Sequence, residues 1–117
     1  MRVIISHNEK KMRKDIAVKL SEHYPNCEMQ SFSDSLFAAK SVYESVNADN
    51  QVDAVFAGSD AIKLIPMMIK AIPSLIIVIV ADNPGHCDEA FSLGAKGYVT
   101  RPYTNEDLFA AVEGRVR

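Results

Sequence analysis

Chemically reactive side chains follow two of the short apolar stretches in this sequence. His7 comes directly after the run "RVIIS", Asp82 directly after "LIIVIVA", and His86 and Cys87 a few residues later. If these runs are parallel strands, their carboxyl ends meet at one edge of a sheet, where ligands and reacting groups gather. Imidazole, carboxylate and thiolate groups suit zinc, but the spacing of these four residues matches no compact metal motif. A metal site is therefore one interpretation, and solvated polar groups at the rim are the other.

A further apolar run ends on a glycine. The stretch "VDAVFAGSDAIK" stops on Gly58, and Ser59 and Asp60 follow it. Glycine brings no side chain to the end of the expected strand, so any chemistry there has to come from its neighbours. Ser59 or Asp60 can cap a helix that follows, which is a common role for both residue types.

Five apolar runs alternate with segments of helical periodicity. The runs are spaced like strands and cover residues 2–6, 28–32, 53–57, 75–81 and 97–100. Three apolar stripes at helical spacing lie between or after them: Met12, Ile16, Leu20 and Tyr24; Leu36, Ala39, Tyr43 and Val46; Leu108, Val112 and Val116. Strands that alternate with helices predict an α/β fold, with a doubly wound five-stranded parallel sheet covered by helices on both faces.

Polar residues and a glycine mark the ends of these helices. Ser33 or Asp34 can cap the second helix, and Thr104 can cap the last one. A short helix over residues 88–93 is predicted to end at Gly94.

The third helical segment contains a proline that leaves two alternatives open. Pro66 can break a helix in mid-segment, because it removes a backbone donor and clashes with the preceding turn. It can also be the first helical residue of about two turns over 66–72, which leaves 59–65 as a loop.

Length and composition indicate one ordinary domain over residues 1–117. Of its 117 residues, 48% are hydrophobic, which is enough for a single core. The 13 basic and 15 acidic residues give a net charge of −2, so we expect no direct nucleic-acid binding. No apolar run is long enough for a bilayer, and the amino-terminal residues do not resemble a signal peptide. Cys27 and Cys87 have no CxxC spacing, so we expect a cytoplasmic protein with free thiols.

The block "SLGAKGYVTRPYTNEDLFAAV", residues 92–112, resembles the end of a response-regulator receiver domain of the CheY-like family. That family has a Gly-Ala turn, a fifth strand with an aromatic residue, and a near-invariant Lys-Pro before a polar-capped last helix. The segments "RVIISHNEKKMR" and "VDAVFAG" match its first and third strands, so the likeness covers the whole chain. The resemblance implies a flavodoxin-like (βα)5 sheet with strand order 2-1-3-4-5. It also allows an output domain to follow Arg117 in a longer regulator.

Receiver domains take a phosphoryl group from a histidine kinase onto an aspartate at the end of the third strand, beside a divalent cation. The resemblance places Ser6 and His7 at the acidic pair, Gly58 at the phosphoacceptor, Ala81 at the switch hydroxyl and Arg101 at the lysine. Glycine cannot accept phosphate, and a neutral pair offers little to Mg²⁺, which prefers oxygen ligands. The planar guanidinium group of arginine is not equivalent to the lysine ammonium group that meets the phosphoryl group in the family. We therefore interpret the chain as a degenerate receiver with no catalytic residue, and no metal or cofactor is implied.

Two residues near this site have alternative roles. Asp60 lies two residues after the vacant acceptor position and can serve as a relocated phosphoacceptor, or it can simply cap a helix. Arg101 can be a special group at the site, or it can pair with Asp82 or Glu9 in a structural salt bridge. In the family, the bond before the equivalent of Pro102 is a cis peptide bond.

The resemblance implies a protein that acts by binding. We expect a domain that is not an enzyme and that binds a histidine kinase, another regulator or an output domain in cis, without phosphorylation. Receiver domains meet their partners on the face between the fourth and fifth helices, which can also form a homodimer. The candidate contacts on that face are Phe91, Tyr98, Tyr103 and Phe109.

Two other functions stay open. One is a receiver that still accepts phosphate, on Asp60. The other is a sensor of a small anion or a metal, in which His7, Arg101 and backbone amides at the rim bind the ligand in the vacated pocket.

Overall fold

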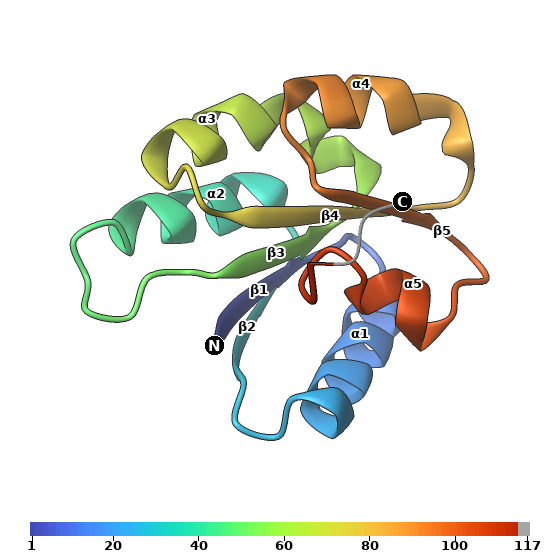
Figure 1. The fold of residues 1–117 in the computed structure, drawn as a ribbon, viewed down its shortest axis with the longest axis horizontal. Coiled ribbons are helices and arrows are strands. Elements are labelled where there is room, and N and C mark those ends of the chain that lie inside the picture. The colour runs from blue at the N-terminus through green and yellow to red at the C-terminus, as the bar shows by residue number, and fades with distance from the viewer. Residues whose placement is uncertain (115–117) are drawn as a thin grey trace.

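The computed structural model describes residues 1–114 and folds them into a parallel sheet between two layers of helices (Figure 1). The strands are β1 (Arg2–Ser6), β2 (Glu28–Phe32), β3 (Ala54–Ala57), β4 (Ile76–Ala81) and β5 (Gly97–Thr100). They pair in the order β2-β1-β3-β4-β5, and every pair is parallel. The predicted α/β class and strand order are therefore confirmed.

Helices cover both faces of this sheet. They are α1 (Lys10–His23), α2 (Ser35–Glu44), the 3₁₀ helix η1 (Ser59–Leu64), α3 (Ile65–Ala71), the 3₁₀ helix η2 (Pro84–His86), α4 (Cys87–Leu93) and α5 (Asn105–Phe109). In Figure 1, α2, α3 and α4 lie on one face and α1 and α5 on the other. None of the helices in residues 1–114 is both long and apolar enough to span a membrane.

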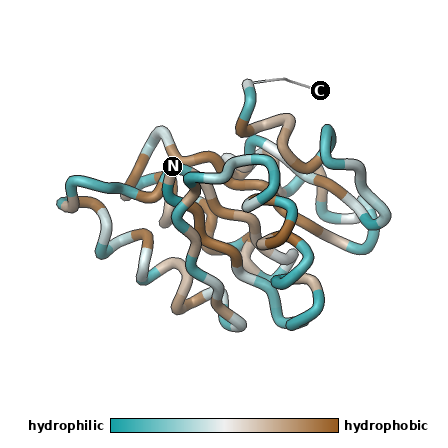
Figure 2. The backbone as a smooth tube through the Cα atoms, turned by 90° about the horizontal axis from the view of Figure 1, so that it is seen from below, coloured by the Kyte–Doolittle hydropathy of each residue, from teal (hydrophilic) through white to brown (hydrophobic). Residues whose placement is uncertain are grey.

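The strands supply side chains to two separate cores because successive residues point to opposite faces. Ile4 of β1 packs into the core under α2 and α3, whereas its neighbours Val3 and Ile5 pack into the core under α1 and α5. Figure 2 shows the hydrophobic stretches running through the middle of the molecule and hydrophilic ones in many of the loops. A sheet buried on both faces explains why its central strands are nearly continuous apolar runs.

The predicted stripe of α1 is confirmed, whereas the predicted stripe of the second helix is confirmed at Ala39 and Val46 and wrong at Leu36 and Tyr43. Met12, Ile16 and Leu20 of α1 are buried. On α2 the buried residues are Ser35, Ala38, Ala39 and Val42, while Leu36 and Tyr43 face outward. Both sets have helical spacing, and the small side chains of the buried set let the helix approach the sheet closely. Leu36 and Tyr43 of the predicted stripe are left on the outside.

Helix ends mostly follow the predicted signals. Asp34 Oδ1 accepts the Leu36 N–H at 2.8 Å, and Thr104 Oγ1 accepts the Asp107 N–H at 3.1 Å. Gly94, with φ of 119°, ends α4 in the left-handed region that favours glycine.

The segment around Pro66 and the last helix both differ in part from the prediction. Pro66 lies in the first turn of α3, as the second alternative predicts, although η1 replaces the expected loop. The last helix ends at Phe109 and continues as turns, so its stripe is shorter than predicted. Leu108 is buried and Val112 partly buried, while Val116 lies outside the described residues.

Candidate functional site

The carboxyl ends of β1, β3 and β4 form a small polar pocket. Ser6 pairs in register with Ala57, and Ala57 with Ile79, so the residues that follow these strands lie close together. The pocket has a volume of about 220 Å³. It is lined by His7, Asn8, Glu9, Gly58, Ser59, Asp60, Val80, Ala81 and Asp82.

The largely buried imidazole of His7 lines this pocket, in surroundings that favour its neutral form. The residue is 8% exposed, and its Nδ1 accepts the Glu9 N–H at 3.0 Å. Burial lowers the pKa of His7 below its usual value, and the charge of Arg101 lowers it further, against the opposing effect of nearby carboxylates. Because Nδ1 is an acceptor, the proton of the neutral ring lies on Nε2.

Gly58 fits under this imidazole because it has no side chain. A Cβ atom placed on Gly58 lies 3.1 Å from Cδ2 of His7 and 3.1 Å from Oδ1 of Asp60. The backbone of Gly58, with φ of −72°, is one that any residue adopts. Glycine is therefore favoured by the close approach of its neighbours and not by its backbone, because a side chain there is tight against His7 and Asp60 and these residues have to shift slightly.

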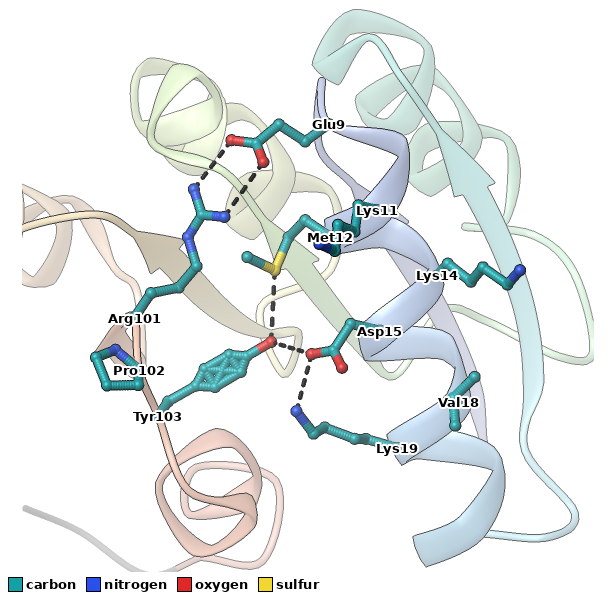
Figure 3. Close-up of a pocket in the computed structure, with 10 residues that line it drawn as sticks. All are labelled: Glu9, Lys11, Met12, Lys14, Asp15, Val18, Lys19, Arg101, Pro102 and Tyr103. Carbon is teal, nitrogen blue, oxygen red and sulfur yellow. Dashed lines mark hydrogen bonds and ion pairs between the residues drawn. The ribbon is translucent and has the colours of Figure 1, made fainter.

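Arg101 is held by two carboxylates. Its Nη2 and Nη1 donate to Oε1 and Oε2 of Glu9 at 2.9 and 3.2 Å, and its Nε donates to Oδ1 of Asp82 at 2.8 Å. Figure 3 shows the guanidinium group facing Glu9. The bonds from Arg101 lower the pKa of Glu9, and the two carboxylates raise the pKa of Arg101. The peptide bond between Arg101 and Pro102 is cis.

Solved structures similar to this chain include response regulator domains. The fold is similar to the response regulatory domain of protein mrkE from Klebsiella pneumoniae, with a TM-score of 0.81 and 24% identity, covering 97% of this chain and 93% of that one. It is also similar to a response regulator receiver domain protein from Clostridium thermocellum, with a TM-score of 0.80 and 20% identity, covering 98% and 93% of the two chains. This chain has the receiver-domain fold.

A longer structure with the same fold is RcsB from Salmonella enterica serovar Typhimurium, bound to promoter rprA in the presence of a phosphomimetic. The TM-score is 0.74 at 20% identity, and the match covers 97% of this chain and 67% of that one. No protein-family model matches the sequence, and no curated protein matches it significantly.

The receiver fold brings together all of the residues predicted at the degenerate site. Ser6 is the last residue of β1, and His7 follows it. Gly58 follows β3, and Ala81 is the last residue of β4. Arg101 follows β5, and its backbone N–H donates to Ala81 O at 3.1 Å. The hydroxyl of Ser6 is buried and has no hydrogen-bond partner within residues 1–114.

The interpretation of His7, Asp82, His86 and Cys87 as a metal site finds no support among the described residues. Within residues 1–114, no three histidine, cysteine, aspartate or glutamate side chains lie close enough to hold one metal ion. His86 instead lies near Glu89, with 3.7 Å between Nδ1 and Oε1. Cys27 and Cys87 are free cysteines, and burial raises the pKa of Cys27.

The predicted interaction face is wrong at Phe109. This side chain is fully buried, stacks on His23 with 4.6 Å between ring centroids, and meets Phe56 edge to face. It faces the core because α5 lies on the sheet with Leu108 and Phe109 turned inward. Phe91 and Tyr98 are partly buried, and Tyr98 donates its hydroxyl proton to Asn83 O at 2.8 Å.

Tyr103 contributes to a groove beside α1 that sequence reasoning missed. The hydroxyl of Tyr103 donates to Asp15 Oδ2 at 2.8 Å and lies 3.4 Å from the sulfur of Met12 (Figure 3). Burial and the bond to Asp15 raise the pKa of Tyr103. The groove measures about 820 Å³ and also contacts Lys11, Lys14, Val18 and Lys19. No local signal finds it, because its two walls are more than 80 residues apart in sequence.

Proposed function

We propose that this receiver-fold domain is an atypical two-component signalling module that acts by binding protein and does not accept phosphate at the end of β3. One observation carries the proposal: the imidazole of His7 packs against Gly58, in the space that a side chain at position 58 has to enter. Position 58 has no aspartate, and His7 and Asp60 leave only tight space for a side chain there.

The state of Arg101 supports the same proposal. A cation at this position can meet a transferred phosphoryl group only if it is free to turn toward it. Arg101 is instead engaged by both oxygens of Glu9 and by Asp82. To reach a ligand, the guanidinium group of Arg101 has to give up its charge-assisted hydrogen bonds to Glu9 and Asp82.

The partner is a protein, and the domain has no catalytic activity of its own. RcsB, whose match covers 67% of its chain, is bound to a promoter in the solved structure, so a receiver fold can belong to a longer DNA-binding regulator. An output domain in cis, a histidine kinase or another regulator fits this chain in the same way. With such partners, we expect the domain to act in the cytoplasm.

Asp60 supports a second candidate function. Its Oδ1 lies 3.1 Å from the position of a Cβ on Gly58, and the residue is exposed at the pocket. A carboxylate next to the vacant acceptor position is a candidate for a relocated phosphorylation site. An anion sensor is less well supported, because Glu9, Asp60 and Asp82 place three carboxylates around the pocket.

Intact mass after incubation with acetyl phosphate and Mg²⁺ tests the proposal. A phospho-accepting receiver domain treated in parallel serves as the positive control. We expect no phosphoryl adduct on this chain. An adduct that disappears in Asp60→Ala overturns the proposal in favour of the relocated acceptor, and an adduct that persists in Asp60→Ala places it elsewhere.

A further inference from the structure

The outer side of α2 carries large apolar side chains that the fold does not use. Leu36, Phe37 and Tyr43 are 63%, 62% and 45% exposed, whereas most exposed helix positions elsewhere are polar. Lys40 and Glu44 lie among them on the same side of the helix. We call these five residues the outer face of α2. Exposed apolar side chains grouped on one side of a helix make that side a candidate site of protein contact.

The charges on the outer face of α2 are unpaired in the single chain. No ion pair within residues 1–114 involves Lys40 or Glu44, although the two residues are one helical turn apart. A lysine placed amino-terminal to a glutamate is also the less favourable order for a pair within one helix. One positive and one negative group are therefore available to a partner.

The arrangement of these residues is complementary to itself. Phe37 lies three residues before Lys40 and Tyr43 three residues after it, while Leu36 and Glu44 lie four residues on either side. If two α2 helices pack antiparallel about a two-fold axis at Lys40, Phe37 of each copy lies opposite Tyr43 of the other. Leu36 then lies opposite the aliphatic stem of Glu44.

The charges agree with the same pairing. Each Lys40 lies about one turn along the axis from Glu44 of the other copy, within reach of its long side chain. Two like charges near the axis therefore each find an opposite charge across the interface. In a two-fold symmetric dimer the same surface of each copy faces the other, so every residue and its contact partner must both lie on that surface. The outer face of α2 meets this condition.

We propose that this domain self-associates through the outer face of α2, with a second copy of the chain as the occupant. The inference deepens the proposed function, on which it rests, because it names the surface and the partner of a domain that acts by protein contact. One short helix forms a small interface, so the dissociation constant is expected at about 10 to 100 µM.

Analytical ultracentrifugation over about 10 µM to about 1 mM, without a phosphodonor, tests the proposal. We expect a monomer–dimer equilibrium that Phe37→Ser weakens about tenfold or more, since loss of a central aromatic contact is costly. Val18→Ser is the matched control, because Val18 is 47% exposed on α1, across the sheet. It is expected to leave the dissociation constant unchanged.

Charge reversal makes the test specific for the antiparallel arrangement. Lys40→Glu and Glu44→Lys each place like charges across the interface, and each is expected to weaken association several-fold. The double variant K40E/E44K reverses both charges and is expected to restore the affinity to within about threefold. Lys14→Glu, at an exposed lysine of α1, controls for net charge. Circular dichroism confirms that each variant is folded.

A chain that stays monomeric up to about 1 mM overturns the inference. So does a dimer that Phe37→Ser leaves intact, or a double charge reversal that weakens association as much as the two single changes combined. These outcomes are independent of the mass measurement. A phosphoryl adduct refutes the proposed function and leaves the α2 dimer standing, whereas a monomer without an adduct refutes only the dimer.

Discussion

The buried imidazole of His7 predicts a specific dependence of stability on pH. His7 is 8% exposed and accepts a backbone hydrogen bond on Nδ1, so the folded chain favours the neutral ring and the pKa of His7 is lowered. In the unfolded chain the ring takes up a proton near its ordinary pKa of about 6.5. As the pH falls through that value, the unfolded state binds more protons at His7 than the folded state does.

The size of this effect follows from proton linkage. At pH 6.5, where half of the unfolded chains are protonated, the free energy of unfolding falls by at most about 0.7 kcal/mol per pH unit, because the folded ring also takes up part of a proton. The slope disappears once the pH is below the lowered pKa of His7 in the folded chain, since both states then bind the proton. The stabilisation is thus complete above about pH 7 and is lost on the acid side. The lowered pKa values of Glu9 and Asp15 act in the same direction, but at lower pH.

Urea denaturation at several pH values between about 5 and 7.5 measures the slope. His7→Asn keeps an acceptor for the Glu9 N–H but cannot titrate, so it is expected to flatten the curve between about pH 5.5 and 6.5. His86→Asn is the matched control, because the side chain of His86 is 59% exposed. Equal slopes for the wild type and His7→Asn would refute the assignment of a buried neutral imidazole.

Three further predictions concern the site and its frame. Arg101→Ala lowers the free energy of unfolding by about 1 kcal/mol, a small loss because the ion pairs of Arg101 are partly exposed. Arg101→Lys lowers it by about half as much, because lysine keeps the charge but cannot bond both oxygens of Glu9. Both losses shrink when urea denaturation is repeated in about 1 M salt. Gly58→Ala destabilises the wild type by about 1 kcal/mol through crowding against His7, but it is close to neutral in a His7→Ala background, as a double-mutant cycle measures. Thr104→Ala costs about 1 kcal/mol in the same assay, because the Asp107 N–H loses its cap.

The strands and their order could be predicted because the signal is local and strong. A sheet buried on both faces produces apolar runs, and crossovers in a parallel sheet need helices between them. The rim positions of Ser6, Gly58 and Arg101 follow from the same pattern, since each residue stands at or directly after the end of a run.

The errors come from contacts that no local pattern encodes. On α2, two stripes with the same spacing compete, and only the fit of alanines against the sheet selects the buried one. Phe109 was predicted to be on the surface, yet it packs against His23 and Phe56, which are distant in sequence. The approach of His7 to Gly58 likewise depends on how β1 and β3 lie side by side.

The central claim is that the rim of this receiver fold does not respond to phosphorylation. Backbone ¹H–¹⁵N NMR spectra with and without Mg²⁺ and beryllofluoride test it most directly. We predict that the amide signals of residues 7–9, 58–60 and 81–82 and of Arg101 stay in place at saturating beryllofluoride. Shifts concentrated at those residues, lost in Asp60→Ala, would contradict the account and identify a working phosphorylation site.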